Sequence, residues 1–510
     1  MTSELTTRSH FSRLMCVSLV SILAAVAASR STQATTLTPA ATTHTDPCLP
    51  LTMPSSTELF NSSKKIFAHY FYPFPVSIDN KASATDYYNT QFLNPHGESN
   101  KHEAEGGYLR QRPLGVPEQA SSANWRQLNM EGEIRAAMAR GITGFTYDAM
   151  EVESPTDSTG PLHTMLAAAA AVDSRFKIVV MPDLTTFKTD SASVVKIIAS
   201  VAHSPAAYRL SDGRLVVTAF DANMNSPAWW ESVLNQLKDE GIDVAFVPTF
   251  LGWSNNAGKF YSFSYGIGDW GTATDPSALQ MEGDPEIVHN EYHRIFMLPV
   301  GPQQFRPKDF LFWEAGNSST FRDGWSSAIH GDADWVQMVT WNDFSESGEI
   351  EPYTDSSLKR DIGTGYYDLN GYYATWFSTG QQPAITHDVL YYFYRREPTN
   401  AAAHAQSRGD TSATGATEND IELVAFLPSA GELKITIDGK TYTKSAPAGI
   451  TSFKVPSAPG VPTFTLLRNG AQVFSFEGGV QIYGTGGIPS GTLDLTYWSG
   501  SASQGGVCSL

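Results

Sequence analysis

The chain has 510 residues, of which 12% are aromatic and only 17% are charged, and its formal net charge is -18. This length and composition are typical of a compact globular enzyme and exclude an intrinsically disordered chain. Nucleic acids and anionic membrane surfaces are not expected as partners, because they would repel a chain of this charge. A neutral polysaccharide is compatible with it.

The N-terminus has the pattern of a secretory signal. Arg8 and Arg13 precede an apolar run over residues 14–28, and small or polar residues follow. We expect a signal peptide over residues 1–34, followed by a Thr/Pro-rich leader over residues 35–63. The run is shorter than the roughly 20 residues of a membrane span, so a signal anchor is the less favoured alternative. The mature protein is therefore expected to be extracellular or in the cell wall, with no membrane attachment.

Strand-like and helix-like stretches alternate from the leader to residue 398. The expected strands are residues 66–71, 144–149, 177–182, 214–219, 244–250, 263–268, 310–314 and 336–341. The expected helices are residues 131–140, 162–172, 193–203, 228–240 and 284–296. This alternation predicts an α/β fold, a (β/α)₈ TIM barrel over residues 64–398. A doubly wound sheet is the alternative, but the first strand is followed by Tyr72-Pro73-Phe74-Pro75 and not by a Gly-rich phosphate turn.

The composition changes after the predicted barrel. Residues 399–418 are rich in Ala, Ser, Gly and Thr and indicate a linker. Residues 419–510 contain short stretches that alternate apolar with polar residues between Gly, Pro and Asp-Gly turns. This spacing predicts a C-terminal all-β sandwich domain.

Two cysteines remain after the predicted signal peptide, Cys48 and Cys508. In an oxidising compartment we expect them to form a disulfide that ties the leader to the C-terminal domain, and two unpaired thiols are the alternative. Cysteines so far apart give no zinc-binding spacing. The sequons at Asn61 and Asn317 permit N-glycosylation on the same secretory route.

Acidic and aromatic residues gather where the predicted strands end, which is where a barrel enzyme carries its site. The last predicted strand ends in Trp341, Asn342, Asp343 and Glu346. The other strand ends deliver His69, Tyr70, Tyr147, Asp148, Asp183, Asp221, Asp269, Trp270, Trp313 and Glu314.

This inventory suits cleavage of a sugar acetal. One carboxylic acid protonates the departing oxygen, and a second carboxylate activates water or attacks the sugar carbon. A serine-hydrolase elbow, a P-loop, a His-Glu-x-x-His pair and a dinucleotide fingerprint are missing, so we expect no cofactor and no metal. The alternatives are a solvated acidic turn for Asp343 and Glu346, helix or turn caps for Asp183 and Asp221, and a buried core role for His69.

The residues after the last predicted strand resemble a known family. Thr340-Trp341-Asn342-Asp343-Phe344-Ser345-Glu346-Ser347 is similar to Thr-Trp-Asn-Asp-Tyr-Gly-Glu-Ser, the hallmark of glycoside hydrolase family 71, the α-1,3-glucanases or mutanases. Phe67-Ala68-His69-Tyr70 and Gly141-Ile142-Thr143-Gly144-Phe145 resemble its first two strands, and Tyr497-Trp498-Ser499-Gly500 resembles its C-terminal β domain.

The resemblance implies a barrel with an appended β-sandwich that hydrolyses α-1,3-glucosidic bonds in α-glucan with inversion. It matches Asp343 and Glu346 to the family's carboxylates. We assign Glu346 as the general acid and Asp343 as the general base, with the exchanged assignment as the alternative, and expect Asp148 to be a third, assisting carboxylate. Substrate-binding roles are expected for His69, Tyr70, Tyr147, Asp183, Asp269, Trp270, Trp313, Trp341 and Asn342. The expected partner is the polysaccharide substrate, and the protein is expected to be a monomer.

The chain also departs from the family pattern. Thr143 replaces an Asp, and Gly348-Glu349-Ile350-Glu351-Pro352 replaces His-Tyr-Ile-Gly-Pro. Residues 72–75 and the insert 76–123 resemble the endo-α-mannosidase-like family 99. An α-glycanase of another specificity, such as an α-mannanase, is therefore one alternative. A catalytically silent carbohydrate-binding protein of the cell wall is another.

Overall fold

A computed structural model describes residues 46–119, 124–154, 159–271, 280–355, 358, 363–401, 412–488 and 493–509. The predicted signal peptide, the first part of the leader and half of the predicted linker lie outside these residues. The described residues all belong to one compact unit, Thr43–Leu510. In this part of the chain, no helix combines the length and the apolar character needed to cross a bilayer.

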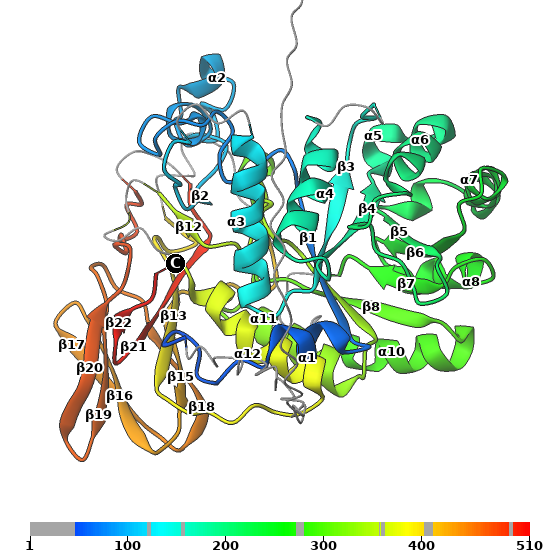
Figure 1. The fold of residues 1–510 in the computed structure, drawn as a ribbon. Coiled ribbons are helices and arrows are strands. Elements are labelled where there is room, and N and C mark those ends of the chain that lie inside the picture. The colour runs from blue at the N-terminus through cyan, green and yellow to red at the C-terminus, as the bar shows by residue number, and fades with distance from the viewer. Residues whose placement is uncertain are drawn as a thin grey trace, which may run out of the picture. The chain divides into compact units, whose positions relative to one another are not determined.

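Eight parallel strands close into a barrel (Figure 1). They are β1 (Lys65–Tyr70), β3 (Gly144–Ala149), β4 (Lys177–Pro182), β5 (Leu215–Ala219), β6 (Val244–Phe250), β7 (Gly266–Asp269), β8 (Ile295–Val300) and β11 (Trp335–Met338). Strand β1 closes the barrel because Phe67 lies opposite both Gly144 of β3 and Gln337 of β11. The predicted barrel is confirmed.

Helices surround the barrel (Figure 1). The longer ones are α3 (Trp125–Ala139), α4 (Pro161–Val172), α6 (Ser191–Val201), α7 (Pro227–Asp239), α11 (Ser319–His330) and α12 (Gly365–Thr379), and the shorter ones include α1 (Ser56–Asn61), α5 (Leu184–Phe187), α8 (Ala257–Phe260) and α10 (Asp284–Ile287). Local sequence sets their starts. In α7, for example, the Ser226 side chain accepts from the backbone of Trp229, and Pro227 occupies the first turn, where its missing N–H costs nothing.

The predicted seventh barrel strand was wrong. We expected residues 310–314 there and a helix over 284–296, but the seventh strand is β8, which follows α10 and the π-helical turn Val288–Tyr292. The continuous apolar run of β8 cannot be distinguished from a buried helix by periodicity alone. Leu311–Trp313 instead forms β10, which pairs with β9 (Gln304–Arg306) and with β14 (Ser412–Thr414) outside the barrel.

The alternation of side chains along each strand separates the barrel interior from its outer layer. Phe67 of β1 packs with Val216, Met297 and Trp335 in an apolar cluster, and these residues belong to strands on all sides of the barrel. Nearer the carboxyl ends the interior is polar: Gln337 donates to Thr146 Oγ1 at 2.6 Å. The polar end is therefore the one suited to a site.

The C-terminal region forms two antiparallel sheets, as predicted. One has the order β18 (Gly449–Pro456), β15 (Asp420–Leu427), β13 (Val389–Arg395), β21 (Tyr497–Ser503) and β22 (Gly506–Val507). The other has the order β17 (Lys440–Ala446), β16 (Gly431–Ile437), β19 (Thr463–Arg468) and β20 (Ala471–Glu477). Buried apolar residues of both sheets, such as Leu423 and Phe464, belong to one cluster. Strand β13 precedes the predicted linker, so the five-stranded sheet includes a strand from the part of the chain before the linker.

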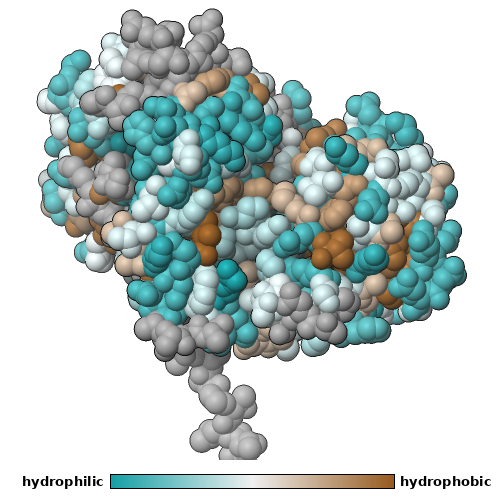
Figure 2. All heavy atoms as spheres, turned by 90° about the horizontal axis from the view of Figure 1, so that it is seen from above, coloured by the Kyte–Doolittle hydropathy of each residue, from teal (hydrophilic) through white to brown (hydrophobic). Residues whose placement is uncertain are grey.

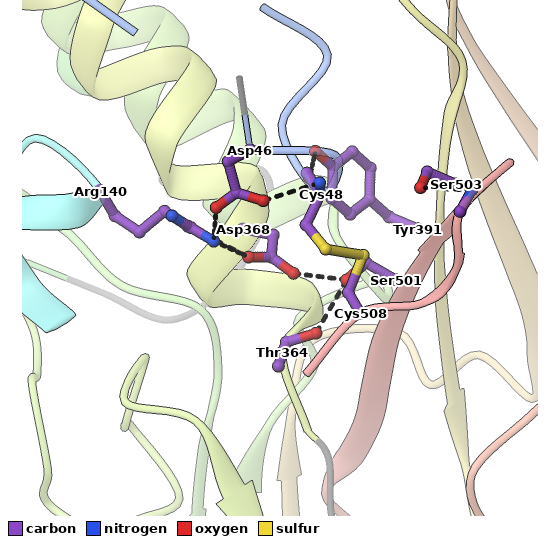
Figure 3. The surroundings of a disulfide bond; sticks show 10 residues. Asp46, Cys48, Arg140, Thr364, Asp368, Tyr391, Ser501, Ser503 and Cys508 are labelled. Atoms are coloured by element: carbon purple, nitrogen blue, oxygen red, sulfur yellow. Dashed lines mark hydrogen bonds and ion pairs between the residues drawn. A yellow bond between two sulfur atoms is a disulfide. The ribbon is translucent and has the colours of Figure 1, made fainter. Parts of the chain in front are cut away.

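The predicted disulfide between Cys48 and Cys508 is present (Figure 3). Its Cα atoms are 5.7 Å apart. Beside it, Arg140 at the end of α3 pairs with Asp46 at 2.8 Å and with the buried Asp368 of α12 at 2.7 Å. This cluster joins the leader, two barrel helices and the C-terminal sheet at one place.

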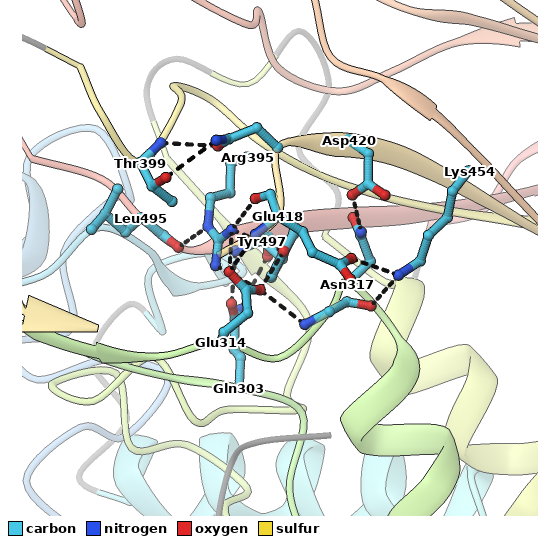
Figure 4. Close-up of polar contacts among 12 residues, drawn as sticks. Gln303, Glu314, Asn317, Arg395, Thr399, Glu418, Asp420, Lys454, Leu495 and Tyr497 are labelled. Carbon is cyan, nitrogen blue, oxygen red and sulfur yellow. Dashed lines mark hydrogen bonds and ion pairs between the residues drawn. The ribbon is translucent and has the colours of Figure 1, made fainter. Parts of the chain in front are cut away.

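A second cluster joins the hairpin of β9 and β10 to the C-terminal sheet (Figure 4). Glu314, directly after β10, pairs with Arg395 of β13 at 3.0 Å and accepts from the Tyr497 hydroxyl at 2.6 Å. Before β9, Gln303 exchanges two hydrogen bonds with the backbone of Tyr497, at 3.1 and 2.7 Å. The Glu314 carboxylate therefore serves this junction.

Candidate active site

The loop after β11 brings Asp343 and Glu346 to the carboxyl end of the barrel. Thr340 shapes the loop: its hydroxyl accepts from the Asp343 backbone at 2.8 Å, and its backbone N–H donates to Gly348 at 2.7 Å. Asn342 ties the loop to the segment after β1, because it accepts from the Phe71 N–H at 2.7 Å and donates to the Phe74 carbonyl at 2.9 Å. Asn342 is thus buried, and both polar atoms of its side chain make hydrogen bonds within the protein.

Asp343 lies in a buried environment that raises its affinity for a proton. Burial and the neighbouring Glu346 raise its pKa to about 7, against the lowering effect of bonds from Ser345 and of the Arg306 charge. The Ser345 hydroxyl and backbone N–H both donate to Asp343 Oδ1, at 2.6 and 3.1 Å. A carboxyl group poised near neutral pH suits proton transfer.

Glu346 is the more open member of the pair, with a side chain 27% exposed. Arg306 of β9 pairs with its Oε1 at 2.9 Å, and Gln304 of the same strand donates to its Oε2. Glu346 also lines a pocket, together with Trp270, Gly271, Pro299, Gly301, Gln303, Gln304, Val339, Thr340 and Gly348. It is therefore the carboxylate that a ligand in this pocket meets.

His69 and Asp148 lie inside the barrel near Asp343. His69 Nε2 lies 3.8 Å from Asp148 Oδ2, and both side chains are buried. Burial raises the pKa of Asp148 well above its usual range, with Asp183 and Asp343 adding to the rise, and burial lowers the pKa of His69 to about 3. Burial therefore favours the neutral form of both groups. Among the described residues, Asp148 Oδ1 and His69 Nδ1 have no hydrogen-bond partner.

Trp270 forms an aromatic wall beside His69. Their ring centroids are 4.8 Å apart in an edge-on arrangement, and Phe220 meets the same indole at 4.7 Å. Trp270 is part-exposed and lines the pocket of Glu346. An exposed indole beside carboxylates offers a flat face to a sugar ring.

The face of the molecule that lies uppermost in Figure 1 is seen directly in Figure 2, where apolar residues border a hollow. Val152, Met224 and Leu251 are exposed apolar residues that follow β3, β5 and β6 at the carboxyl ends of the strands. A wider pocket lined by Arg214, Tyr265 and His289 lies away from these loops, near the start of β5 and β8. Neither Asp343 nor Glu346 lines it.

Several predicted substrate-binding residues lie elsewhere in the fold. Tyr70 faces outward and donates to Glu133 of α3 at 3.0 Å, and Tyr147 stacks on it with centroids 5.8 Å apart. Trp341 is fully buried against Phe145. The structure therefore does not bring these three aromatic residues into the pocket.

Asp183 and Asp269 organise loops at the rim. Asp183 caps α5, as the capping alternative predicts. The backbone N–H and the hydroxyl of Thr185 both donate to its carboxylate, each at 2.6 Å. Asp269 accepts from the backbone of Gly252 and of Trp253, each at 3.1 Å, and burial raises its pKa to about 6.

Trp313, on β10, is part-exposed, and the Arg306 guanidinium lies over its ring at 5.1 Å. Arg306 therefore links the Trp313 ring to Glu346. Of the two sequons, Asn61 is exposed at the end of α1, whereas Asn317 is fully buried and donates to Asp420 at 2.5 Å.

Gln304 and Arg306 are not among the predicted site residues, because the sequence predicts neither a strand nor a helix between residues 296 and 310. The polar, apolar, polar order of Gln304-Phe305-Arg306 could have indicated a strand with one buried face. The contact of this stretch with Glu346 joins residues far apart in the sequence, so no local pattern predicts it.

A family model and several named proteins match this chain. The sequence model described as glycosyl hydrolase family 71 matches residues 119–509. A glucan endo-1,3-alpha-glucosidase of Schizosaccharomyces pombe is 25% identical over 373 residues, covering 69% of this chain and 86% of that protein. A mutanase of Penicillium rubens is 22% identical over 392 residues, covering 72% and 83%.

Among related proteins is also an ascus wall endo-1,3-alpha-glucanase of Schizosaccharomyces pombe, 22% identical over 413 residues, which cover 72% of this chain and 92% of that one. Among solved structures, the family 99 endo-alpha-mannosidase of Bacteroides thetaiotaomicron has a TM-score of 0.46 at 14% identity, covering 62% of this chain and 97% of that chain.

Proposed function

The chain belongs to glycosyl hydrolase family 71, and we propose that it cleaves α-1,3-glucosidic bonds in α-glucan with Asp343 and Glu346 as its acid–base pair. It is a glycoside hydrolase, as its family and its named relatives establish. The observation that carries the proposal is the placement of these two carboxylates after β11, one buried and one on a pocket with Trp270. The relatives' activity on 1,3-α-glucan supports the linkage.

The surroundings of the two carboxylates support separate roles. Glu346 borders the pocket, so it can reach the oxygen of the leaving sugar as general acid. Asp343, whose pKa burial raises to about 7, is a stronger base than an exposed aspartate and suits the activation of water.

Asp148 and His69 assist from the barrel interior. Each keeps a buried polar atom without a partner in the described part of the chain. Buried polar atoms are costly when unpaired, so a sugar hydroxyl that bonds them gains affinity. We assign Asp148 in its protonated form as a donor to substrate and His69 as its neutral neighbour. Trp270 and Trp313 are the proposed sugar platforms.

We further propose that the protein is secreted and acts outside the cell or in the cell wall as a monomer. The signal-like N-terminus and the disulfide of Cys48 and Cys508 support this, since disulfides persist in oxidising compartments. We propose a barrel domain within residues 64–398, a linker at 399–418 and a β-sandwich domain at 419–510, to which β13 (Val389–Arg395) from before the linker adds a strand.

Incubation with insoluble α-1,3-glucan and with a panel of α-1,4-glucan, α-1,6-glucan and α-mannan tests the proposal. Release of reducing ends from α-1,3-glucan alone is expected. Release from mannan alone would favour the α-mannanase alternative, and binding without release from any polymer would refute hydrolysis. Asp343→Asn and Glu346→Gln are each expected to lower turnover by orders of magnitude. The first anomer seen by NMR tests inversion.

A further inference from the structure

Strand β9 holds Glu346 through three consecutive residues. The backbone N–H of Phe305 donates to the Glu346 carbonyl at 2.7 Å. On either side of it, Gln304 donates to Oε2 and Arg306 to Oε1, the latter at 2.9 Å. We propose that Gln304 and Arg306 are positioning residues for Glu346, an inference that rests on the hydrolysis proposed above. One strand thus supplies a separate donor to each carboxylate oxygen.

Arg306 also contacts the neighbouring strand of the same hairpin. Its guanidinium lies 5.1 Å from the centroid of the Trp313 ring, and Trp313 pairs with Gln304 across the two strands. The Arg306 side chain is 33% exposed, so substrate can reach it. The guanidinium therefore lies between an indole and the acid, where it orients Glu346 before a sugar arrives.

The hairpin is fastened to the C-terminal sheet at both ends (Figure 4). Gln303 binds the backbone of Tyr497 before β9, and Glu314 binds Arg395 after β10. Between these ends, Phe305 and Phe312 pack with Leu493 and Leu495. The C-terminal region therefore supports the strand that positions Glu346, a role distinct from polysaccharide binding.

The Arg306 charge also acts on Asp343, whose pKa it lowers. The titratable or charged groups that influence Asp343 or are influenced by it are Glu346, Glu349, Asp148, Tyr108 and Arg306. Arg306 is the cation among these. Removal of its charge therefore raises the pKa of Asp343 above about 7, an effect that loss of packing alone would not have.

Arg306→Gln, Arg306→Lys and Gln304→Glu test the inference, with Lys308→Gln as the matched control because Lys308 is an exposed cation of the same hairpin. Arg306→Gln is expected to lower kcat on α-1,3-glucan roughly 10- to 100-fold with KM little changed, and to move the acidic limb of the pH profile upward. Gln304→Glu should move the same limb upward. Arg306→Lys should keep the limb in place, and Lys308→Gln should match the wild type.

Equal loss in Arg306→Lys and Arg306→Gln, or an unmoved limb in both Arg306→Gln and Gln304→Glu, would overturn the positioning role. A wild type that is inactive on α-1,3-glucan would instead refute the proposed function. In that case ¹³C NMR titration of labelled aspartate carboxyls still decides the inference. A higher Asp343 pKa in Arg306→Gln, at an unchanged unfolding temperature, supports it, and an unchanged Asp343 pKa refutes it.

Discussion

The hydroxyl of Ser345 donates to Asp343 Oδ1 at 2.6 Å, and the backbone N–H of the same residue donates to the same oxygen at 3.1 Å. Both bonds favour the charged carboxylate and so oppose the effect of burial. The proton affinity of Asp343 is therefore set by a balance that one side chain can shift.

Ser345→Ala is expected to raise the pKa of Asp343 above its value of about 7. The lost bond to a charged group corresponds to about one pH unit. Because the proposed base must be ionised, the acidic limb of the kcat/KM profile should move to higher pH, with activity near pH 6 suffering most. Ser345→Thr keeps the hydroxyl and is the control. A limb that stays in place in Ser345→Ala would show that the hydroxyl does not tune Asp343.

Glu346→Gln and Asp343→Asn should respond differently to the leaving group. A fluoride leaves without a protonated acid, so Glu346→Gln should hydrolyse an α-1,3-linked oligoglucosyl fluoride at close to the wild-type rate while losing activity on glucan. Asp343→Asn should be slow on both substrates, because water still needs its base. Initial rates on the two substrates make the comparison, and the opposite pattern would exchange the roles.

The unfolding temperature is expected to fall as pH rises from 5 to 8. Burial raises the pKa of Asp148, Glu133, Asp343, Glu349 and Glu351 above the ordinary 3.8 for Asp and 4.5 for Glu, to about 7 for Asp343 and about 8 for Glu133. These five groups thus bind more protons in the folded than in the unfolded state between these limits, and they outnumber His69, whose lowered pKa acts in the opposite direction. Stability is therefore full below the unfolded pKa values and lost as pH rises, by up to about 1.4 kcal/mol per pH unit for each group.

Calorimetry across that range measures the effect, with Glu351→Gln as the matched variant. Its amide cannot ionise, so its unfolding temperature should depend less steeply on pH than that of the wild type. A wild-type unfolding temperature that rises between pH 5 and pH 8 would contradict the buried-proton interpretation.

N-glycosylation is expected at Asn61 and not at Asn317. Asn61 is exposed, whereas Asn317 is fully buried and its amide nitrogen donates to Asp420 at 2.5 Å. A glycan on that nitrogen has no space in the folded protein. Peptide mapping before and after glycosidase treatment of protein from a glycosylating host distinguishes the sites, and a glycan on the Asn317 peptide would contradict the packing described here.

Loss of the disulfide should destabilise the protein by about 2–5 kcal/mol. The Cys48→Ser/Cys508→Ser double variant avoids a free thiol, and reduction of the wild type is the parallel test. Urea unfolding measures both. Since the bond lies far in sequence from Asp343, activity at low temperature should remain. Equal stability of the protein with and without the disulfide would show that the Arg140 cluster suffices to hold the leader.

The barrel, and the placement of Asp343 and Glu346 at its carboxyl end, could be predicted because their signals are local. Asp343 and Glu346 follow an apolar strand within a few residues, and the motif around them is distinctive. The seventh strand, Ile295–Val300, was missed because a fully buried strand lacks the alternation that marks a strand. The disulfide was predictable because Cys48 and Cys508 are the only cysteines after the predicted signal peptide.

The surroundings of the acid pair were harder to predict, for two physical reasons. Tyr70 and Tyr147 were placed in the site by their position at strand ends, although neighbouring side chains on a strand point to opposite faces. His69 and Asp148 face inward for the same reason that Tyr70 and Tyr147 face outward. Arg306 meets Glu346 only through tertiary folding, and no local pattern encodes such a contact.

The bond between Cys48 and Cys508 closes a loop across a sequence separation of 460 residues. Residues 48–508 are thereby part of one covalent ring. An exopeptidase that trims either end stops at the bridge, and a single cut in an exposed loop leaves both fragments attached to each other. For an enzyme proposed to work among extracellular proteases, a nicked molecule can therefore keep its barrel and its C-terminal sheets together.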